Sequence, residues 1–417
     1  MTASLECPRR RLTPRVALFL GSVALAPYSM AVLPVLGPGL RQHFGMGISE
    51  LGLLYAAVFV AGMIGMAIVG PLGDRFNRRT MICTALLCVA ASNVLCSLGQ
   101  KFAVFAAGVL AAGFFISAIG VALPAYMAHL YQGRARQTMA LSYTVLAIPY
   151  VAFPFLVDRL LRAYPGRFPL VLYAPYAAVA IMVLAGTMIF LRAPSDRLPP
   201  TATPEGHVSL RDGLRQLSHP AMRLIIVLCI IHGASDVGFC YWFPTYAERQ
   251  FSGALQHPGS VLALVGLAYL VSRSILVFLP ERHGRRAMLI APGILGGLIL
   301  LAAIWLNRPA VLFWGYPLAA LAWSSEFPAL MGEAARRAPR YVSSVLAICT
   351  LATSAGTSAA VYVMGQFMRV AGDSAPWWMP DRRWAVTMSP LGFILFGVVA
   401  AVSGLGRAEA SAPADRG

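Results

Sequence analysis

Apolar residues along this chain gather in long runs that are separated by short polar stretches. Runs of about 20 residues are long enough to cross the hydrocarbon core of a bilayer as α-helices. Twelve such runs lie near 15–36, 49–70, 80–98, 102–128, 137–157, 169–192, 222–245, 259–279, 287–306, 309–332, 342–368 and 384–405. The pattern therefore predicts an all-α membrane protein with twelve transmembrane helices.

One polar stretch is much longer than the others, and six apolar runs lie on each side of it. It is rich in proline and charge, so it cannot build a core and is typical of a linker. We expect an N-terminal six-helix bundle over 1–192, a cytoplasmic linker over 193–220, a C-terminal six-helix bundle over 221–406 and a disordered tail over 407–417.

The two halves also carry related sequences. The segment Leu123–Ala128 (Leu-Pro-Ala-Tyr-Met-Ala) recurs 204 residues later as Phe327–Gly332 (Phe-Pro-Ala-Leu-Met-Gly). A charged turn that contains Asp74 recurs 207 residues later with Glu281 in its place. Two matches at nearly one offset indicate a parallel duplication, so we expect the bundles to be related by a pseudo-two-fold axis along the membrane normal.

Composition and charge support a membrane protein and indicate its orientation. Only 12% of the residues are charged, against about 25% in a typical soluble domain, and the mean hydropathy is +0.70. With the amino terminus in the cytoplasm, 22 of the 33 basic residues lie inside, 10 lie outside and Arg273 lies in a helix. This positive-inside bias predicts a multi-pass protein of a bacterial-type cytoplasmic membrane with both termini in the cytoplasm, and it argues against nucleic-acid binding despite the net charge of +17.

The segment Gly70–Arg79 carries the most specific motif. It reads Gly-Pro-Leu-Gly-Asp-Arg-Phe-Asn-Arg-Arg and resembles the signature loop of the major facilitator superfamily, Gly-x-Leu-Ala-Asp-Arg-x-Gly-Arg-Arg. Gly73 and Asn77 depart from that pattern. The resemblance covers the whole chain through the number of spans, the linker position and the internal repeat. It implies two six-helix bundles that rock about a central site, and we expect a monomer.

The same resemblance implies a gating role for the charged turns. In the family's loop, the carboxylate at the position of Asp74 pairs with arginine and caps a helix of the other half, and we expect Gly70 to allow the helices to approach closely. The alternative is a solvated turn whose arginines only set the topology. The expected gating residues are Gly70, Asp74, Arg75, Arg78, Arg79, Glu281, Arg282 and Arg285.

Few charged or titratable residues lie well inside the predicted spans, where each charge is costly. His232 and Asp236 are four residues apart and share a helical face, so they can bind and release a proton. The alternative is a neutral histidine that serves packing alone. Arg273 and Glu326 lie at equal depth, which predicts a structural ion pair. The alternative is a functional role, in which Glu326 binds a proton or Arg273 binds an anionic solute. We assign proton coupling to His232, Asp236 and Glu326.

Polar and aromatic residues at helical spacing predict a cavity lining. A stripe of hydroxyls on the eleventh span is the clearest case, although serine and threonine also promote simple helix contact. The candidate substrate-binding residues are Tyr28, Tyr126, Tyr241, Trp242, Arg273, Thr350 and Ser354.

Several function classes are disfavoured by missing motifs. Lys101 is the only lysine and Phe102 follows it, so the chain has no ATP-binding P-loop. The seven cysteines form no close CxxC pair, which argues against a zinc site or a disulfide framework. No hydrolase motif is present. We therefore expect no enzyme, no cofactor and no metal. A non-transporting sensor or a membrane enzyme is the less favoured alternative.

Secondary transport of a small organic solute, coupled to protons across the lipid bilayer, is the function that we predict. The direction stays open. The segment 146–155 lacks the glycines that proton-driven drug exporters carry in the fifth helix, but other exporters lack them too. Uptake of an organic anion and export of a drug, siderophore or metabolite are both compatible with the sequence.

Overall fold

The computed structural model describes residues 14–72, 78–130, 135–192, 219–251, 254–255, 257–278, 285–338, 342–371 and 381–405. In this part of the chain all regular secondary structure is α-helical, which confirms the predicted all-α class. Nearly all of the predicted linker and the whole predicted tail lie outside the described residues, so these two predictions remain predictions.

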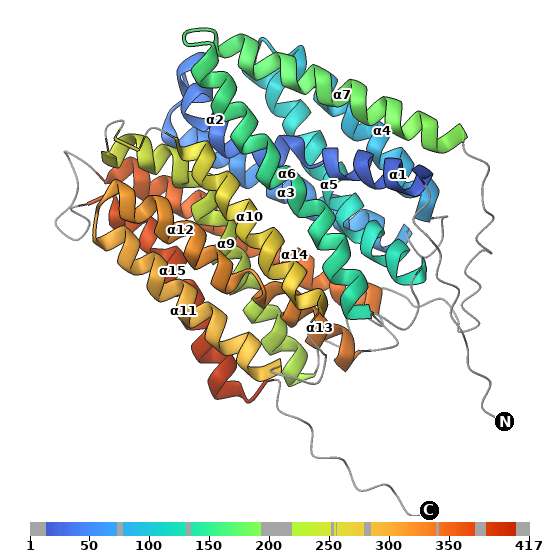
Figure 1. Ribbon diagram of the computed structural model, residues 1–417, viewed down its shortest axis with the longest axis vertical. Helices are drawn as coiled ribbons and strands as arrows, with labels where there is room; N and C mark the ends of the chain where they lie inside the picture. Colours follow the sequence, from blue (N-terminus) through green and yellow to red (C-terminus); the bar gives the residue numbers. More distant parts are fainter. Residues whose placement is uncertain are drawn as a thin grey trace, which may run out of the picture.

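The helices before the linker pack together as one bundle, which is coloured blue to green in Figure 1. Their bounds are α1 (Pro14–Leu25), α2 (Tyr28–Phe44), α3 (Ile48–Leu72), α4 (Arg78–Ser97), α5 (Phe102–Leu130), α6 (Ala135–Ala163) and α7 (Phe168–Arg192).

The helices after the linker form the second bundle, coloured yellow-green to red in Figure 1. Their bounds are α9 (Pro220–Phe251), α10 (Pro258–Phe278), α11 (Arg285–Trp305), α12 (Pro309–Trp323), α13 (Glu326–Arg337), α14 (Val342–Val370) and α15 (Arg383–Ser403). Among the described residues, eleven helical segments are long and apolar enough to cross a membrane. The short helices α12 and α13 together make the twelfth crossing.

The first predicted helix, 15–36, is two helices rather than one. The helix breaks at Ala26 and Pro27, between α1 and α2. Proline has no N–H for the helical ladder, and it pushes the residue before it out of the helical conformation, so the break lies where the sequence changes from Ala26 to Pro27. The second piece then continues to Phe44, well past the predicted end.

The predicted helix 309–332 is also broken, at Ser324 and Ser325 between α12 and α13. Pro328 supplies no N–H for the carbonyl of Ser324, four residues earlier. Serine hydroxyls compete for backbone groups as well, and the Ser325 hydroxyl lies 3.5 Å from the carbonyl oxygen of Ala322. The break makes Glu326 the first residue of α13, in the middle of the crossing.

The two bundles meet along two equivalent seams. In one seam α3 packs against α14, and in the other α10 packs against α6. These pairs exchange under the duplication, because α3 corresponds to α10 and α6 to α14. Close approach depends on small residues: a Cβ added to Gly365 of α14 would lie 3.4 Å from Cα of Gly52 of α3. The seams confirm two six-helix bundles related by pseudo-two-fold symmetry.

Hydrogen bonds join the bundles at the end of the molecule where α3 begins and α14 ends. We call this end the distal end, because α1 begins and α15 ends at the opposite one. The bonds that cross between the bundles here include Ser260 Oγ to Asp158 Oδ2 (2.9 Å) and Ser49 Oγ to Gln366 Oε1 (3.4 Å). Bonds deeper in the same interface include Tyr241 Oη to Met30 O (3.3 Å) and Ser358 Oγ to Ala56 O (3.1 Å). The distal end is therefore closed.

Candidate functional site

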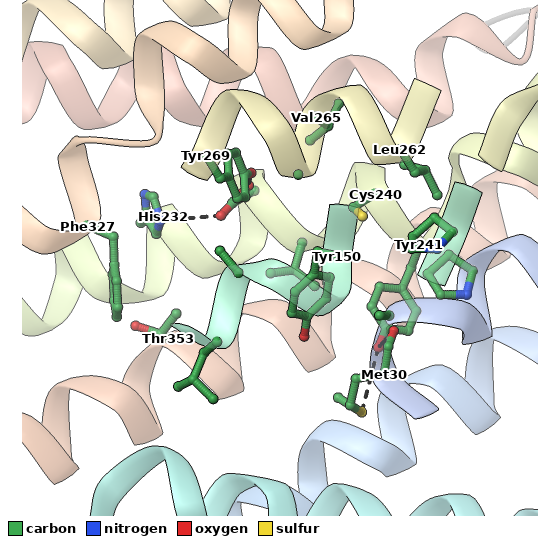
Figure 2. A pocket seen from close by; sticks show the side chains of 18 of the residues that line it. Met30, Tyr150, His232, Cys240, Tyr241, Leu262, Val265, Tyr269, Phe327 and Thr353 are labelled. Atoms are coloured by element: carbon green, nitrogen blue, oxygen red, sulfur yellow. Dashed lines mark hydrogen bonds and ion pairs between the residues drawn. The ribbon is translucent and has the colours of Figure 1, made fainter. Parts of the chain in front are cut away.

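A cavity of about 310 Å³ lies between the two bundles, and Figure 2 shows its lining. Helices α2, α3 and α6 of the first bundle and α9, α10, α13 and α14 of the second contribute side chains to it. Its volume is at the lower end of the range for small-molecule sites. Because both bundles line it, a movement of one bundle against the other changes its access.

A cluster of three ionisable side chains lies at one end of this cavity. Nε2 of His232 lies 3.6 Å from Oδ2 of Asp236, and Nδ1 lies 3.2 Å from Oε2 of Glu326. The exposed fractions are 3% for His232, 9% for Asp236 and 0% for Glu326. The imidazole thus bridges two carboxylates, one at the cavity wall and one fully buried behind it.

Local packing fixes the orientation of the histidine. Its ring stacks on Phe327, with 5.2 Å between centroids and 17° between planes. Phe393 and Phe396 meet the same ring edge-on. A ring held on three sides keeps each nitrogen directed at one carboxylate.

The helix break explains how Glu326 reaches the cluster. Glu326 is in the first turn of α13, where the partial positive charge of a helix N-terminus favours a carboxylate. Its Oε1 atom has no hydrogen-bond partner. A Cβ added to Gly293 of α11 would lie 2.7 Å from that atom, so the glycine makes room for the side chain.

Two further side chains extend the cluster towards α10 and α12. The hydroxyl of Tyr269 donates a hydrogen bond to Oδ1 of Asp236. Nε1 of Trp323 donates to the Tyr269 hydroxyl at 3.1 Å. Each oxygen of the Asp236 carboxylate therefore has its own neighbour, tyrosine on one side and histidine on the other.

The predicted ion pair between Arg273 and Glu326 is not the pair that forms. Glu326 is bonded to His232, while the guanidinium carbon of Arg273 lies 5.0 Å from the ring centroid of Tyr269. Equal depth in the membrane fixes only one coordinate of a side chain. The break at Ser324 directs Glu326 towards α9, and four-residue spacing places Arg273 over Tyr269 on α10.

Three of the predicted substrate contacts line the cavity. They are Tyr241 of α9, Arg273 of α10 and Thr350 of α14. The Thr350 hydroxyl donates to the carbonyl of Leu346 at 2.8 Å. Their role in binding remains a prediction.

The other four predicted contacts are placed differently. Tyr28 is fully buried in the first bundle, edge-on to Phe153 and Tyr176. Trp242 is fully buried and donates to the carbonyl of Val361 in its own bundle at 2.7 Å. Its ring meets Tyr55 of the first bundle edge-on, so it lies in the seam between the bundles. Ser354 is half-buried and does not line the cavity. The side chain of Tyr126 lies outside the described residues.

Most of the predicted gating residues also fall outside the described part of the chain. This applies to Asp74, Arg75, Glu281 and Arg282, to the side chains of Arg78 and Arg285, and to the surroundings of Gly70. Arg79 is half-buried in the first turn of α4. The gating role therefore remains a prediction.

The sequence reading missed several cavity residues. Tyr269 and Tyr150 line the cavity, as do Met30 and Phe327. The available signal for Tyr269 was its four-residue spacing from Arg273, which places both on one helical face. Met30 and Phe327 carried no signal, because apolar residues fill every span.

The arrangement suits proton exchange better than metal binding. Among the described residues, no group of three or more His, Cys, Asp and Glu side chains could hold a metal ion. An imidazole between two carboxylates can instead take a proton at one nitrogen and give it up at the other.

Comparisons with known proteins agree with this architecture. The sequence profile of the Major Facilitator Superfamily matches residues 18–361. The uncharacterized MFS-type transporter YceJ of Bacillus subtilis (strain 168) is 23% identical over 360 residues, which cover 84% of this chain and 88% of that protein.

Solved structures show the same fold at low sequence identity. A D-xylose-proton symporter has a TM-score of 0.73 and 15% identity, over 93% of this chain and 95% of its own. The human organic anion transporter MFSD10 has a TM-score of 0.67 and 18% identity, over 93% and 98%. The chain is a multi-pass membrane transporter of a small solute rather than an enzyme, and it belongs to the Major Facilitator Superfamily.

Proposed function

We propose that this transporter couples the movement of a small organic solute to protons, and that His232, Asp236 and Glu326 bind the coupling proton. The observation that carries the proposal is the contact of one imidazole with two buried carboxylates beside the cavity. Such charges are expensive inside a membrane, so they need a reason beyond packing.

The positions of the three groups suggest an order of proton transfer. Asp236 lies at the cavity wall, whereas Glu326 is fully buried behind His232. A proton that reaches Asp236 can pass to Nε2 of His232, while the imidazolium releases its Nδ1 proton to Glu326. The imidazole then returns to its first form by exchanging its remaining proton between the two nitrogens.

Proton binding and solute binding are linked because they share one cavity wall. A change of protonation alters the net charge of a buried cluster, and an uncompensated buried charge is costly. A solute beside Asp236 therefore changes the affinity for protons, and protons change the affinity for the solute by the same factor. Similarity to a D-xylose-proton symporter is consistent with such coupling.

Alternating access completes the proposed cycle. The distal end is closed in this structure, so the opposite end is the one that must close in the other state. We assign that closure to the charged turns around Gly70–Arg79 and Leu279–Arg286. With the termini in the cytoplasm of a bacterial-type inner membrane, the distal end faces outward. Uptake and export both fit this cycle.

Transport in liposomes tests the proposal. Purified protein should accumulate or expel solute under an imposed pH gradient. Asp236→Asn should abolish that driven flux, while exchange of labelled for unlabelled solute continues at solute concentrations high enough to offset the weaker binding. Asp381→Asn is the matched control, because Asp381 pairs with Arg383 at the distal end, away from the cavity. Full driven flux in Asp236→Asn would refute the assignment of the proton site.

A further inference from the structure

The cavity offers few free polar groups to a solute. The hydroxyl of Thr353 donates to the carbonyl of Cys349 at 2.9 Å, just as that of Thr350 donates within its own helix. The Tyr241 hydroxyl donates to the carbonyl of Met30. The donor hydrogens of these hydroxyls are thus already committed to the backbone.

Most of the remaining wall is apolar. It includes Phe59, Leu146, Val237, Leu262, Val265 and Phe327. These side chains cannot form hydrogen bonds, and a polar group buried against them without a partner is strongly disfavoured. The acidic and basic groups are gathered at one end, where Asp236 and Arg273 line the cavity together with His232.

We infer that the solute of this cavity is largely apolar and carries one polar or ionised end that lies against Asp236. This inference rests on the proposed function and names its substrate class. A monosaccharide would bring several hydroxyls into a wall that satisfies few of them. The similarity to a sugar symporter is therefore a similarity of fold and not of cargo.

Thermal unfolding of the detergent-purified protein tests this inference. Benzoate and benzylamine, each an aromatic ring with one ionised group, serve as probes, with D-xylose for comparison. We expect at least one aromatic probe to raise the melting temperature in a concentration-dependent way, and D-xylose to leave it unchanged. A rise with D-xylose, or none with either aromatic probe, would overturn the inference. If an aromatic probe binds but no proton-driven flux is found, the proposed proton coupling is contradicted and the inferred substrate class is not.

A pair of matched variants locates the binding. Val265→Thr replaces a methyl of the cavity wall by a hydroxyl. It should weaken binding of the aromatic probe about fourfold, which corresponds to the transfer free energy of one buried methyl group. Val271→Thr makes the same change on the outer face of α10, where the side chain is 43% exposed, and should not alter affinity. Equal affinities in all three proteins would contradict a site at this wall.

A second inference concerns the distal closure. At the seam of α6 and α10, the Ser260 hydroxyl donates to Oδ2 of Asp158 at 2.9 Å, and Nη2 of Arg162 donates to the same oxygen at 2.8 Å. Asp158 is only 5% exposed. A Cβ added to Gly259 would lie 2.6 Å from Cβ of Asp158, so the two bundles touch here.

The other seam holds an equivalent but weaker contact. Ser49, at the start of α3, donates to Oε1 of Gln366 near the end of α14 at 3.4 Å. Gln366 follows Asp158 by 208 residues, and Ser260 follows Ser49 by 211, close to the offsets of the internal repeat. A neutral bond of 3.4 Å is weak, whereas a bond to a carboxylate is about twice as strong as a neutral one.

We propose that Asp158 and Ser260 form the principal latch of the distal gate, and that Ser49 and Gln366 form its lesser counterpart. The two helices of each contact belong to different bundles, so both contacts must break when the distal end opens. Arg162 stays on α6 with Asp158, and it keeps the carboxylate paired in either state.

Native Cys240 provides a reporter, because it lines the cavity. In a variant without the other six cysteines, a membrane-impermeant thiol reagent is applied in turn to each face of oriented vesicles. Ser260→Ala should speed labelling from the distal face by about tenfold, which corresponds to the net free energy of a hydrogen bond to a charged group. It should slow labelling from the opposite face. Ser49→Ala, the matched control, should change both rates much less.

Faster labelling from the distal face together with slower labelling from the opposite face distinguishes a gate from a general loss of stability. A merely destabilised protein would label faster from both faces. Parallel acceleration, unchanged rates in Ser260→Ala, or an equal effect of Ser49→Ala would each overturn the assignment of Asp158 and Ser260 as the principal latch.

Discussion

At the scale of single residues, the cluster around His232 shows what a sequence can and cannot place. The proximity of the His232 and Asp236 side chains could be predicted, because residues four positions apart on a helix are neighbours on one face. The bond from His232 to Glu326 could not, because it joins side chains 94 positions apart on different helices. The orientation of Glu326 depends on a helix break that spacing alone does not reveal.

Gly293 provides a test at this scale. Gly293→Ala would place a Cβ 2.7 Å from Oε1 of Glu326 and 2.8 Å from the carbonyl of Phe393, so one of them must move. We expect the free energy of unfolding to fall by about 1–3 kcal/mol, and proton-driven flux to weaken as Glu326 shifts. Gly120→Ala is the control, because a Cβ there meets nothing within 4 Å. Equal stability and flux in both variants would count against the crowding of Glu326.

At the scale of elements, the duplication makes the helix break informative. α5 corresponds to α12 and α13, and it continues through Pro124, the counterpart of Pro328 at an offset of 204. Proline alone therefore does not break the crossing. The residues that match Ser324 and Ser325 are Gly120 and Val121, so the two serines distinguish the broken crossing from the continuous one. One apolar run could thus predict a crossing but not its interruption.

Removing the proline tests the purpose of the break. Pro328→Ala supplies an N–H for the carbonyl of Ser324, which favours a continuous helix and draws Glu326 away from His232. We expect proton-driven flux to fall by about tenfold, because small displacements of an acting group cost that much or more. Pro124→Ala in the continuous α5 should change flux little. If the two variants behave alike, the break has no part in coupling.

At the scale of the whole molecule, the sequence already determined the main architecture. Hydrophobic run lengths predicted the number of crossings, and the repeat at offsets of 204 and 207 predicted equivalent bundles. The seams and the cavity could not be predicted, because they depend on which helical faces meet across the bundles. Trp242 illustrates this: it was predicted to bind solute, yet it is fully buried in a seam and bonded to Val361.

The central claim is that solute and protons move together through the cluster of His232, Asp236 and Glu326. Its most direct measurement is the simultaneous flux of protons and solute in liposomes, with a solute gradient and no imposed pH gradient. The wild-type protein should move protons in a fixed ratio to solute, whereas Glu326→Gln, which keeps the shape but not the ionisable group, should move solute without protons. Solute flux without protons in the wild type, or an unchanged ratio in Glu326→Gln, would contradict the account.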